Sequence, residues 1–165
     1  MSTLNVTTIQ DSAAAFEHAR LVQVEHASIA TLVSGTTVMP HDNTIPQNDE
    51  GVQVITQAIT PTHASNKLLI QCIVGSCYAT ASDEYLIALF QDSTAGALAC
   101  NNGHSSGAET LVLNHYMTTG TTSSTTFKVR FGLASSGTVT CNSNAGSVWG
   151  GGVGVSSITI SEIRV

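Results

Sequence analysis

The sequence predicts an all-β domain of antiparallel strands, either a sandwich or a barrel, and three observations support this fold class. Stretches of alternating or β-branched residues recur from Leu21 onward, and clusters of Gly, Ser, Asn, Asp and Thr separate them. The intervening stretches are too short for the crossover helices that parallel strands require. Hydrophobic residues make up 42% of the chain but aromatic ones only 5%, so we expect Val, Ile, Leu and Ala to fill the core.

Residues 1–19 differ from the rest, and we expect them to form a short N-terminal arm in front of a single domain at residues 20–165. A β-prone stretch at 4–9 precedes a segment in which Asp11 or Ser12 can cap a helix of about two turns. A helix this short is not stable alone, so it must lie against the main domain, a sister chain or a partner. We therefore interpret the arm as an anchor. Its apolar contacts would come from Leu4, Val6, Ile9 and Phe16.

The strands of the domain are expected where the alternating or β-branched stretches lie. They are predicted at residues 20–26, 29–33, 36–39, 52–59, 67–79, 84–91, 96–100, 110–118, 125–133, 137–142 and 155–164. The stretch 67–76 is apolar at nearly every position, which predicts a central strand buried on both faces. The stretch 156–163 alternates small polar and apolar residues, which predicts a half-buried strand.

The charge content is low and limits the class of partner. Lys and Arg number 5 and Asp and Glu 11, so charged residues are 10% of the chain, against about 25% in an average soluble domain. The net charge of −6 and the absence of a basic cluster argue against binding to nucleic acid. No apolar run is long enough to span a membrane. A surface hydrated by 19 Ser and 22 Thr suits dense packing against further copies, because repulsion between neighbours stays small.

Residues that often bind metals are present but not in a metal-binding arrangement. The histidines occur singly, without the spacing that places two imidazoles on one ion. The acidic loop with Asp42, Asn43, Asp49 and Glu50 lacks the calcium-loop pattern, so we expect a solvated loop. The four cysteines form no C-x-x-C pair, and we expect them to be reduced and buried as small hydrophobic residues. We predict neither a metal site nor a cofactor.

One motif resembles that of an enzyme. Gly103–Gly107 matches G-x-S-x-G, the nucleophile elbow of serine hydrolases, with Ser105 as the nucleophile and His115 further along. That elbow joins a strand to a helix, whereas a strand is expected after it here. We therefore predict a flexible loop and no catalytic residues, and keep a Ser105 hydrolase as an alternative.

Four stretches in the domain carry a resemblance to a known group of proteins. They are Ile59-Thr60-Pro61 with Ser65–Ile70, Ala88–Ala95, Thr125–Arg130 and Val155–Ile163. In this order and spacing they resemble the jelly-roll domains at the ends of bacteriophage tail fibres and on virion surfaces. The opening residues 2–9 are similar to the short N-terminal anchors of such proteins. The chain lacks the heptads or repeats of a fibre shaft, which puts a long fibre built from it in doubt.

The resemblance implies a jelly roll of the tumour-necrosis-factor-like type, assembled as a homotrimer and acting by binding. We expect a capsid decoration (cement) protein that stabilises the capsid exterior at the virion surface, with the arm bound to the major capsid protein or a tail adaptor. The alternative is a receptor-binding knob of a tail fibre or baseplate that recognises host-surface glycans through end loops at 101–109 and 143–154. The candidate ligand-binding residues in those loops are Asn101, His104, Asn144 and Trp149.

Overall fold

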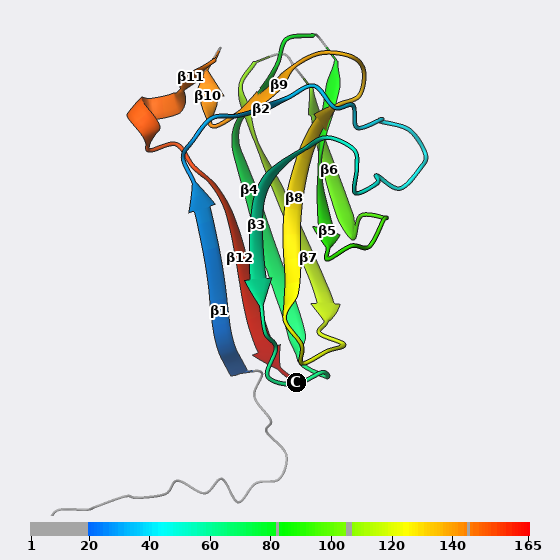
Figure 1. Cartoon of the computed structure of the whole chain (residues 1–165). Helices are drawn as coiled ribbons and strands as arrows, with labels where there is room; N and C mark the ends of the chain where they lie inside the picture. The colour runs from blue at the N-terminus through cyan, green and yellow to red at the C-terminus, as the bar shows by residue number, and fades with distance from the viewer. Residues whose placement is uncertain (1–19, 82, 105–106, 145) are drawn as a thin grey trace, which may run out of the picture.

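Two antiparallel β-sheets packed face to face form the domain in the computed structural model, which describes residues 20–165 except 82, 105–106 and 145 (Figure 1). The elements are β1 (Arg20–Ile29), β2 (Val33–Gly35), β3 (Val52–Ile59), β4 (Lys67–Ala79), β5 (Glu84–Gln91), β6 (Ala99–His104), β7 (Glu109–Thr118), β8 (Thr125–Leu133), β9 (Val139–Cys141), β10 (Ser143–Asn144), β11 (Ser147–Val148), the 3-10 helix η1 (Trp149–Gly152) and β12 (Ser156–Arg164). The predicted all-β class is confirmed. No helix in the described part of the chain is long and apolar enough to cross a membrane. The predicted arm, residues 1–19, lies outside the described residues.

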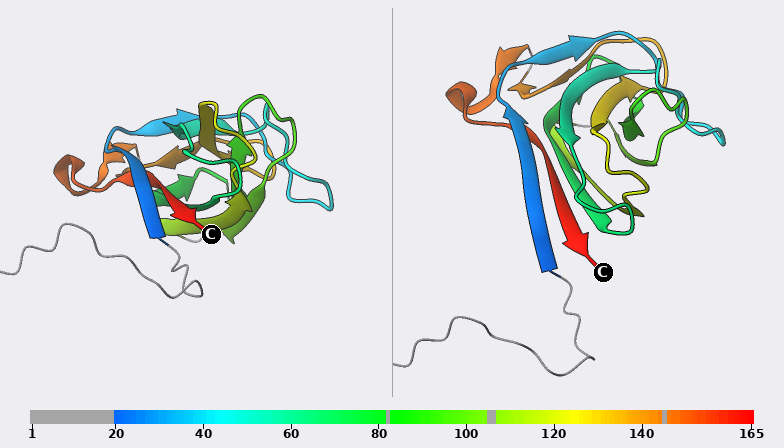
Figure 2. Two further views of the ribbon diagram at one scale, coloured as in Figure 1. Left: turned by 90° about the horizontal axis from the view of Figure 1, so that it is seen from below. Right: turned by 60° about the horizontal axis from the view of Figure 1, so that its bottom comes forward.

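The strand order is that of a jelly roll, as predicted. One sheet has the order β1-β12-β4-β7, and the other has the order β3-β8-β5-β6. Beyond β12, the upper end of β4 pairs with β9, which in turn pairs with β2. Both views of Figure 2 show β1 and β12 side by side at one edge of the first sheet. The start of β1 and the C-terminus share the lower end in Figure 1, and the β10–β11 hairpin and η1 stand at the upper end.

The core lies between the sheets and contains both aliphatic and aromatic side chains. Leu68, Ile70 and Ile158 are fully buried on the inner face of the first sheet, as the aliphatic expectation requires. The second sheet adds Tyr85 and Phe131, whose rings meet edge to face with centroids 5.4 Å apart. Aromatic residues are few, but the largest fully buried side chains are aromatic. The predicted core of Val, Ile, Leu and Ala was therefore incomplete.

Four strands have the predicted boundaries, and the other predictions need correction to different degrees. The strands at 52–59, 67–79, 84–91 and 125–133 match β3, β4, β5 and β8. Strand β1 runs on to Ile29, and β6 begins three residues later than predicted. The prediction at 36–39 is wrong. This stretch belongs to a loop whose Met39 is fully buried with Leu86, Ala88 and Phe90, so its apolar character reflects the covering of a sheet face.

Strand β4 is central, as predicted, but it is not buried on both faces. It lies between β12 and β7, with Leu68, Ile70 and Cys72 facing the core. On its other face, Gln71 and Ile73 are exposed in the single chain. Strand β12 alternates between buried and half-buried positions, so the half-buried prediction is confirmed.

A buried carboxylate joins three segments at the lower end of the sandwich. Glu162 on β12 is fully buried and accepts hydrogen bonds from the amide of Asn66 at 2.6 Å and that of Gln23 at 2.6 Å. The backbone N–H and the hydroxyl of Thr62 donate to it at 2.9 Å each, and the N–H of His63 lies at 3.4 Å. Burial raises the pKa of Glu162, but these hydrogen bonds outweigh it and hold the pKa below its ordinary value. The charged carboxylate thus fixes the β3–β4 loop to β1 and β12.

A buried amide has the corresponding position at the upper end. Asn142 is fully buried, and its side chain donates to the carbonyls of Ile29 at 3.3 Å and Thr31 at 3.0 Å. Its Oδ1 accepts from the hydroxyl of Ser156 at 2.7 Å, and its backbone N–H donates to Gly75 at 2.8 Å. Asn142 has φ of 56°, a conformation that asparagine tolerates better than most residues. This residue therefore joins the start of β12 to β4 and to the β1–β2 connection.

Removing the Glu162 carboxylate should destabilise the fold. We expect Glu162→Ala to lower the free energy of unfolding by about 3 kcal/mol at pH 7, because it leaves buried donors without an acceptor. Since the pKa of Glu162 is lowered on folding, its contribution is present above the unfolded-state pKa and is lost as the pH falls through the folded-state pKa. Urea unfolding of both proteins between pH 7 and pH 2 measures this. Glu25→Gln, which removes a partly exposed carboxylate, is the control. An unfolding free energy equal to that of the wild type at pH 7 would contradict the role of Glu162.

Candidate binding surfaces

The outer face of the β1-β12-β4-β7 sheet is an uncovered surface with almost no charge. Strand register places its residues in four cross-strand rows. The rows are Ser28–Ser157–Ile73–Val112, His26–Thr159–Gln71–Asn114, Val24–Ser161–Leu69–Tyr116 and Leu21–Ile163–Lys67–Thr118. We call these residues the bare face. Only Lys67 among them carries a permanent charge, and its ammonium donates to the Thr118 hydroxyl at 2.6 Å.

Large apolar side chains of the bare face stand in solvent in the single chain. Tyr116 is 55% exposed, Val24 48%, Val112 45% and Ile73 42%. The polar residues between them satisfy one another in part, as His26 and Thr159 do at 2.9 Å. Exposed large apolar side chains among uncharged polar ones are typical of protein–protein contact surfaces.

The outer face of the second sheet differs, because the chain covers part of it. Phe90 and Leu86 on β5 point outward there and are buried beneath the loop that carries Met39. On β8, the guanidinium of Arg130 donates to the backbone carbonyls of Glu50 and Gly51, which holds the same loop. The bare face has no such cover among the described residues, so it is the larger unpartnered surface of the sandwich.

A pocket of about 280 Å³ adjoins the upper end of the bare face. Gly75, Thr110 and Val155 form its floor, and Trp149, which is 49% exposed, forms a wall. Close packing fixes the indole, since a Cβ on Gly154 would lie 2.6 Å from its Cδ1. Glu109 also lines the pocket, but its carboxylate lies on the face of β7 that carries Leu111 and accepts a hydrogen bond from the buried Tyr85 hydroxyl at 3.2 Å. An aromatic plane beside the hydroxyl-bearing residues Ser76 and Thr110 can bind a ligand that has both an apolar face and hydroxyl groups.

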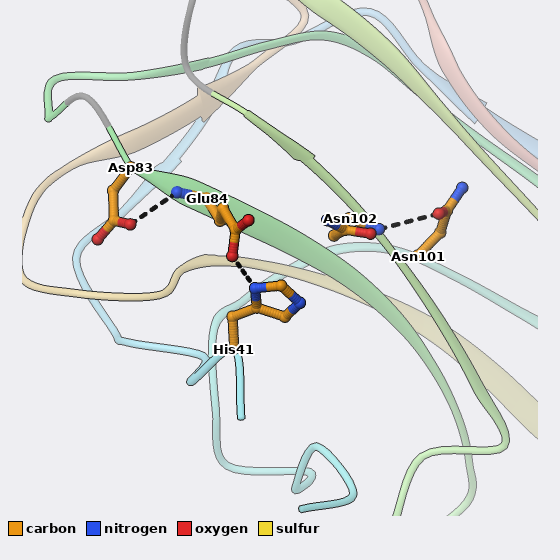
Figure 3. A network of polar contacts seen from close by, with 5 residues as sticks. All are labelled: His41, Asp83, Glu84, Asn101 and Asn102. Carbon is orange, nitrogen blue, oxygen red and sulfur yellow. Dashed lines mark hydrogen bonds and ion pairs between the residues drawn. The ribbon is translucent and has the colours of Figure 1, made fainter. Parts of the chain in front are cut away.

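A second, smaller pocket of about 190 Å³ lies beside the edge strand β6. Asn101, Asn102 and the exposed thiol of Cys100 line it together with His41, whose Nδ1 contacts the carboxylate of Glu84 (Figure 3). The backbone N–H of Asn102 donates to the side chain of Asn101 at 2.9 Å. Asn101 is engaged further, because its amide donates to the carbonyl of Val112 at 2.8 Å. Its side chain therefore joins β6 to β7.

The cysteines confirm the prediction only in part. Cys72, Cys77 and Cys141 are buried, whereas Cys100 is exposed, and all are free thiols. Burial raises the pKa of Cys72 to about 12 and that of Cys141 to about 11, so both remain thiols at neutral pH. Among the described residues, no group of three or more His, Cys, Asp or Glu side chains is placed to hold a metal ion.

The predicted ligand-binding residues do not converge on one site. Trp149 and Asn101 line different pockets. His104 ends β6 opposite Glu84, and Asn144 is exposed in the β10–β11 hairpin. The predicted anchor residues Leu4, Val6, Ile9 and Phe16 lie outside the described residues, as does Ser105.

Sequence reasoning missed the bare face. The alternation of Val112, Asn114 and Tyr116 on one face of β7 was a usable signal for an exposed apolar row. The pairing that joins this row to β1, β12 and β4 depends on register, which the sequence does not state.

No protein-family model matches the chain, and no curated protein matches it. Solved structures with related folds include the Eiger TNF of S. frugiperda, at 12% identity and a TM-score of 0.47, with 88% of this chain and 94% of that chain covered. The C-terminal domain of EclA, described as a sugar-binding protein, matches at 14% identity and a TM-score of 0.41, over 82% of this chain and 86% of the other. A chain of the tomato aspermy virus structure matches at 11% identity and a TM-score of 0.29, over 85% and 78%.

Proposed function

We propose that the protein is a non-enzymatic component of a bacteriophage virion surface, a homotrimeric capsid decoration protein whose residues 1–19 bind the capsid. The observation that carries the proposal is the bare face, an uncharged, partly apolar sheet surface left open in the single chain. The resemblance to tumour-necrosis-factor-like jelly rolls implies a trimer. The bare face is a surface through which the three copies could contact one another.

The energetics of the bare face support association between copies. A large apolar side chain contributes about 1.5–3 kcal/mol when it moves from full exposure to full burial. Tyr116, Val24, Val112 and Ile73 are already about half buried, so each can supply about half of that on contact. No repulsion between permanent charges opposes the contact except at Lys67, which lies in the lowest row. Several such contacts per interface can offset the entropy lost on association.

The lower end of the sandwich suits attachment to a particle. Strand β1 begins there at Arg20, so residues 1–19 join the domain at that end, whereas the β10–β11 hairpin lies at the opposite end (Figure 1). A decoration protein would then hold the capsid through its lower end and its arm. Many modest contacts repeated over the particle would add to a large stabilisation.

A charge placed on the bare face should separate the trimer. We expect the wild type to have about three times the chain mass of 17.1 kDa in light scattering coupled to size-exclusion chromatography. Tyr116→Glu should have the mass of one chain, because it would bury a carboxylate without a partner. Gln53→Glu, an exposed position on β3 of the second sheet, should leave the mass unchanged. A wild-type monomer, or a Tyr116→Glu trimer, would refute this interface.

Deletion of residues 1–19 should abolish particle binding without dissolving the trimer. The domain retains its core and the bare face, whereas the proposed anchor residues Leu4, Val6, Ile9 and Phe16 are lost. Quantitative mass spectrometry of purified particles measures the copy number against the major capsid protein. We expect a ratio comparable with that protein for the full chain and none for the truncation. Binding by the truncation would contradict the anchor, and a ratio matching only the tail attachment points would move the protein to the tail.

A second function, recognition of host-surface glycans by a tail knob, is favoured by one observation, the exposed indole of Trp149 beside Ser76 and Thr110 in the upper pocket. Sugars stack their apolar faces on such rings and form hydrogen bonds from their hydroxyls to polar side chains. In this case a glycan array should show saturable binding that Trp149→Ala lowers at least tenfold. Val153→Ala, at an exposed position near the same pocket, is the control. The absence of binding to any glycan would favour the decoration role.

A further inference from the structure

The lower end of the sandwich contains a pocket of about 540 Å³ with two arginines in its lining. Arg20 begins β1 and Arg164 ends β12, and strand register places them directly opposite each other. The β3–β4 loop supplies the facing wall with Thr62, His63 and Ser65. The pocket therefore lies between the start of β1, the end of β12 and the β3–β4 loop.

The two guanidinium groups are like charges that line one pocket. Like charges directly opposite on antiparallel strands are destabilising. Neither arginine has an ion pair or a side-chain hydrogen bond with a described residue. The nearest carboxylate along β12 is Glu162, but the amides and hydroxyl described above already occupy it. A chain with only 5 cationic side chains thus places two of them at one pocket, and neither has an ion pair with a described side chain.

The loop opposite the arginines is held in place before any ligand arrives. The backbone N–H of Gly120 donates to the carbonyl of Ala64 at 3.0 Å, and the hydroxyl of Thr119 donates to that of His63 at 2.8 Å. Glu162 fixes the start of the same loop. Such a wall loses little conformational entropy on binding.

His63 is oriented so that one ring nitrogen remains for a ligand. Its Nδ1 accepts the backbone N–H of Ser65 at 3.2 Å and lies 2.9 Å from the hydroxyl of that residue. A backbone N–H can only donate, so Nδ1 bears the lone pair in the neutral ring and Nε2 carries the hydrogen. Nε2–H is a further donor at the pocket, and it has no partner among the described residues.

We propose that this pocket binds an oxyanion, a phosphate or carboxylate group, between Arg20 and Arg164. A planar guanidinium donates two parallel N–H groups to such an oxyanion, and two guanidiniums with the Nε2–H of His63 can surround one anionic group. The anion would replace the repulsion between the arginines by two attractions. The site is formed by a single chain, so it does not depend on the proposed trimer or on capsid binding.

Calorimetric titration of the full chain with inorganic phosphate, at constant ionic strength set with sodium chloride, tests the site. We expect saturable binding that Arg20→Gln and Arg164→Gln each weaken about tenfold and that the double variant abolishes. Lys128→Gln makes the same charge change on β8 of the other sheet and should bind as the wild type does. A parallel titration with citrate distinguishes the source of the oxyanion, since stronger binding of one probe assigns the site to phosphate or to carboxylate groups.

Thermal unfolding separates loss of the site from loss of the fold. In chloride alone, Arg164→Gln should unfold at the same temperature as the wild type or higher, because it removes the like-charge pair. Phosphate should then raise the unfolding temperature of the wild type and of Lys128→Gln more than that of Arg164→Gln. Absence of saturable binding of both probes, or equal binding by all variants, would overturn the proposal.

Discussion

The Glu162 carboxylate is the interaction on which the lower half of the molecule depends. A buried carboxylate is stable only if its charge is compensated, and here neutral donors from two distant segments do this without a cation. The loop at Thr62 and Asn66 therefore has one position relative to β12. Because β1 pairs with β12 and also supplies the amide of Gln23, the edge of the bare face is fixed by the same group. The Glu162 carboxylate thus holds in place both the pocket with Arg20 and Arg164 and the edge of the bare face.

Most of the fold could be predicted from the sequence because strand signals are local. Alternation within 52–59 and 125–133, bounded by turn residues, predicts β3 and β8 with their observed ends. The strand predicted at 36–39 is wrong for a tertiary reason. Met39 is apolar because it packs on Phe90, and it does not pair in a sheet. Local patterns describe which residues avoid water, but they do not distinguish a strand from a loop that packs on one.

The candidate sites were harder to predict, because each is created by register or by contact between distant segments. Arg20 and Arg164 are 144 positions apart, as their numbers give, and meet only through the β1–β12 pairing. Alternation places Glu162 on the buried face of β12 with Ile158 and Ile160, but the donors that make a carboxylate stable there come from β1 and the β3–β4 loop. Trp149 is a candidate ligand-binding residue from its sequence alone, but the residues that line its pocket with it come from β4 and β7. The sequence shows which residues could bind a ligand, but it does not show which other residues lie beside them in space.

The composition of β4 links the sequence to the proposed assembly. Its apolar run predicts burial on both faces, and the single chain buries only one. The outer positions Leu69 and Ile73 are therefore apolar without being needed for the core. Next to them, β12 presents the small hydroxyl residues Ser157, Thr159 and Ser161, which allow another backbone to approach closely. Large side chains on the flanking strands and small ones on β12 form a groove along this face, which a second copy can fill. Contact there would bury the outer face of β4, as its apolar sequence predicts.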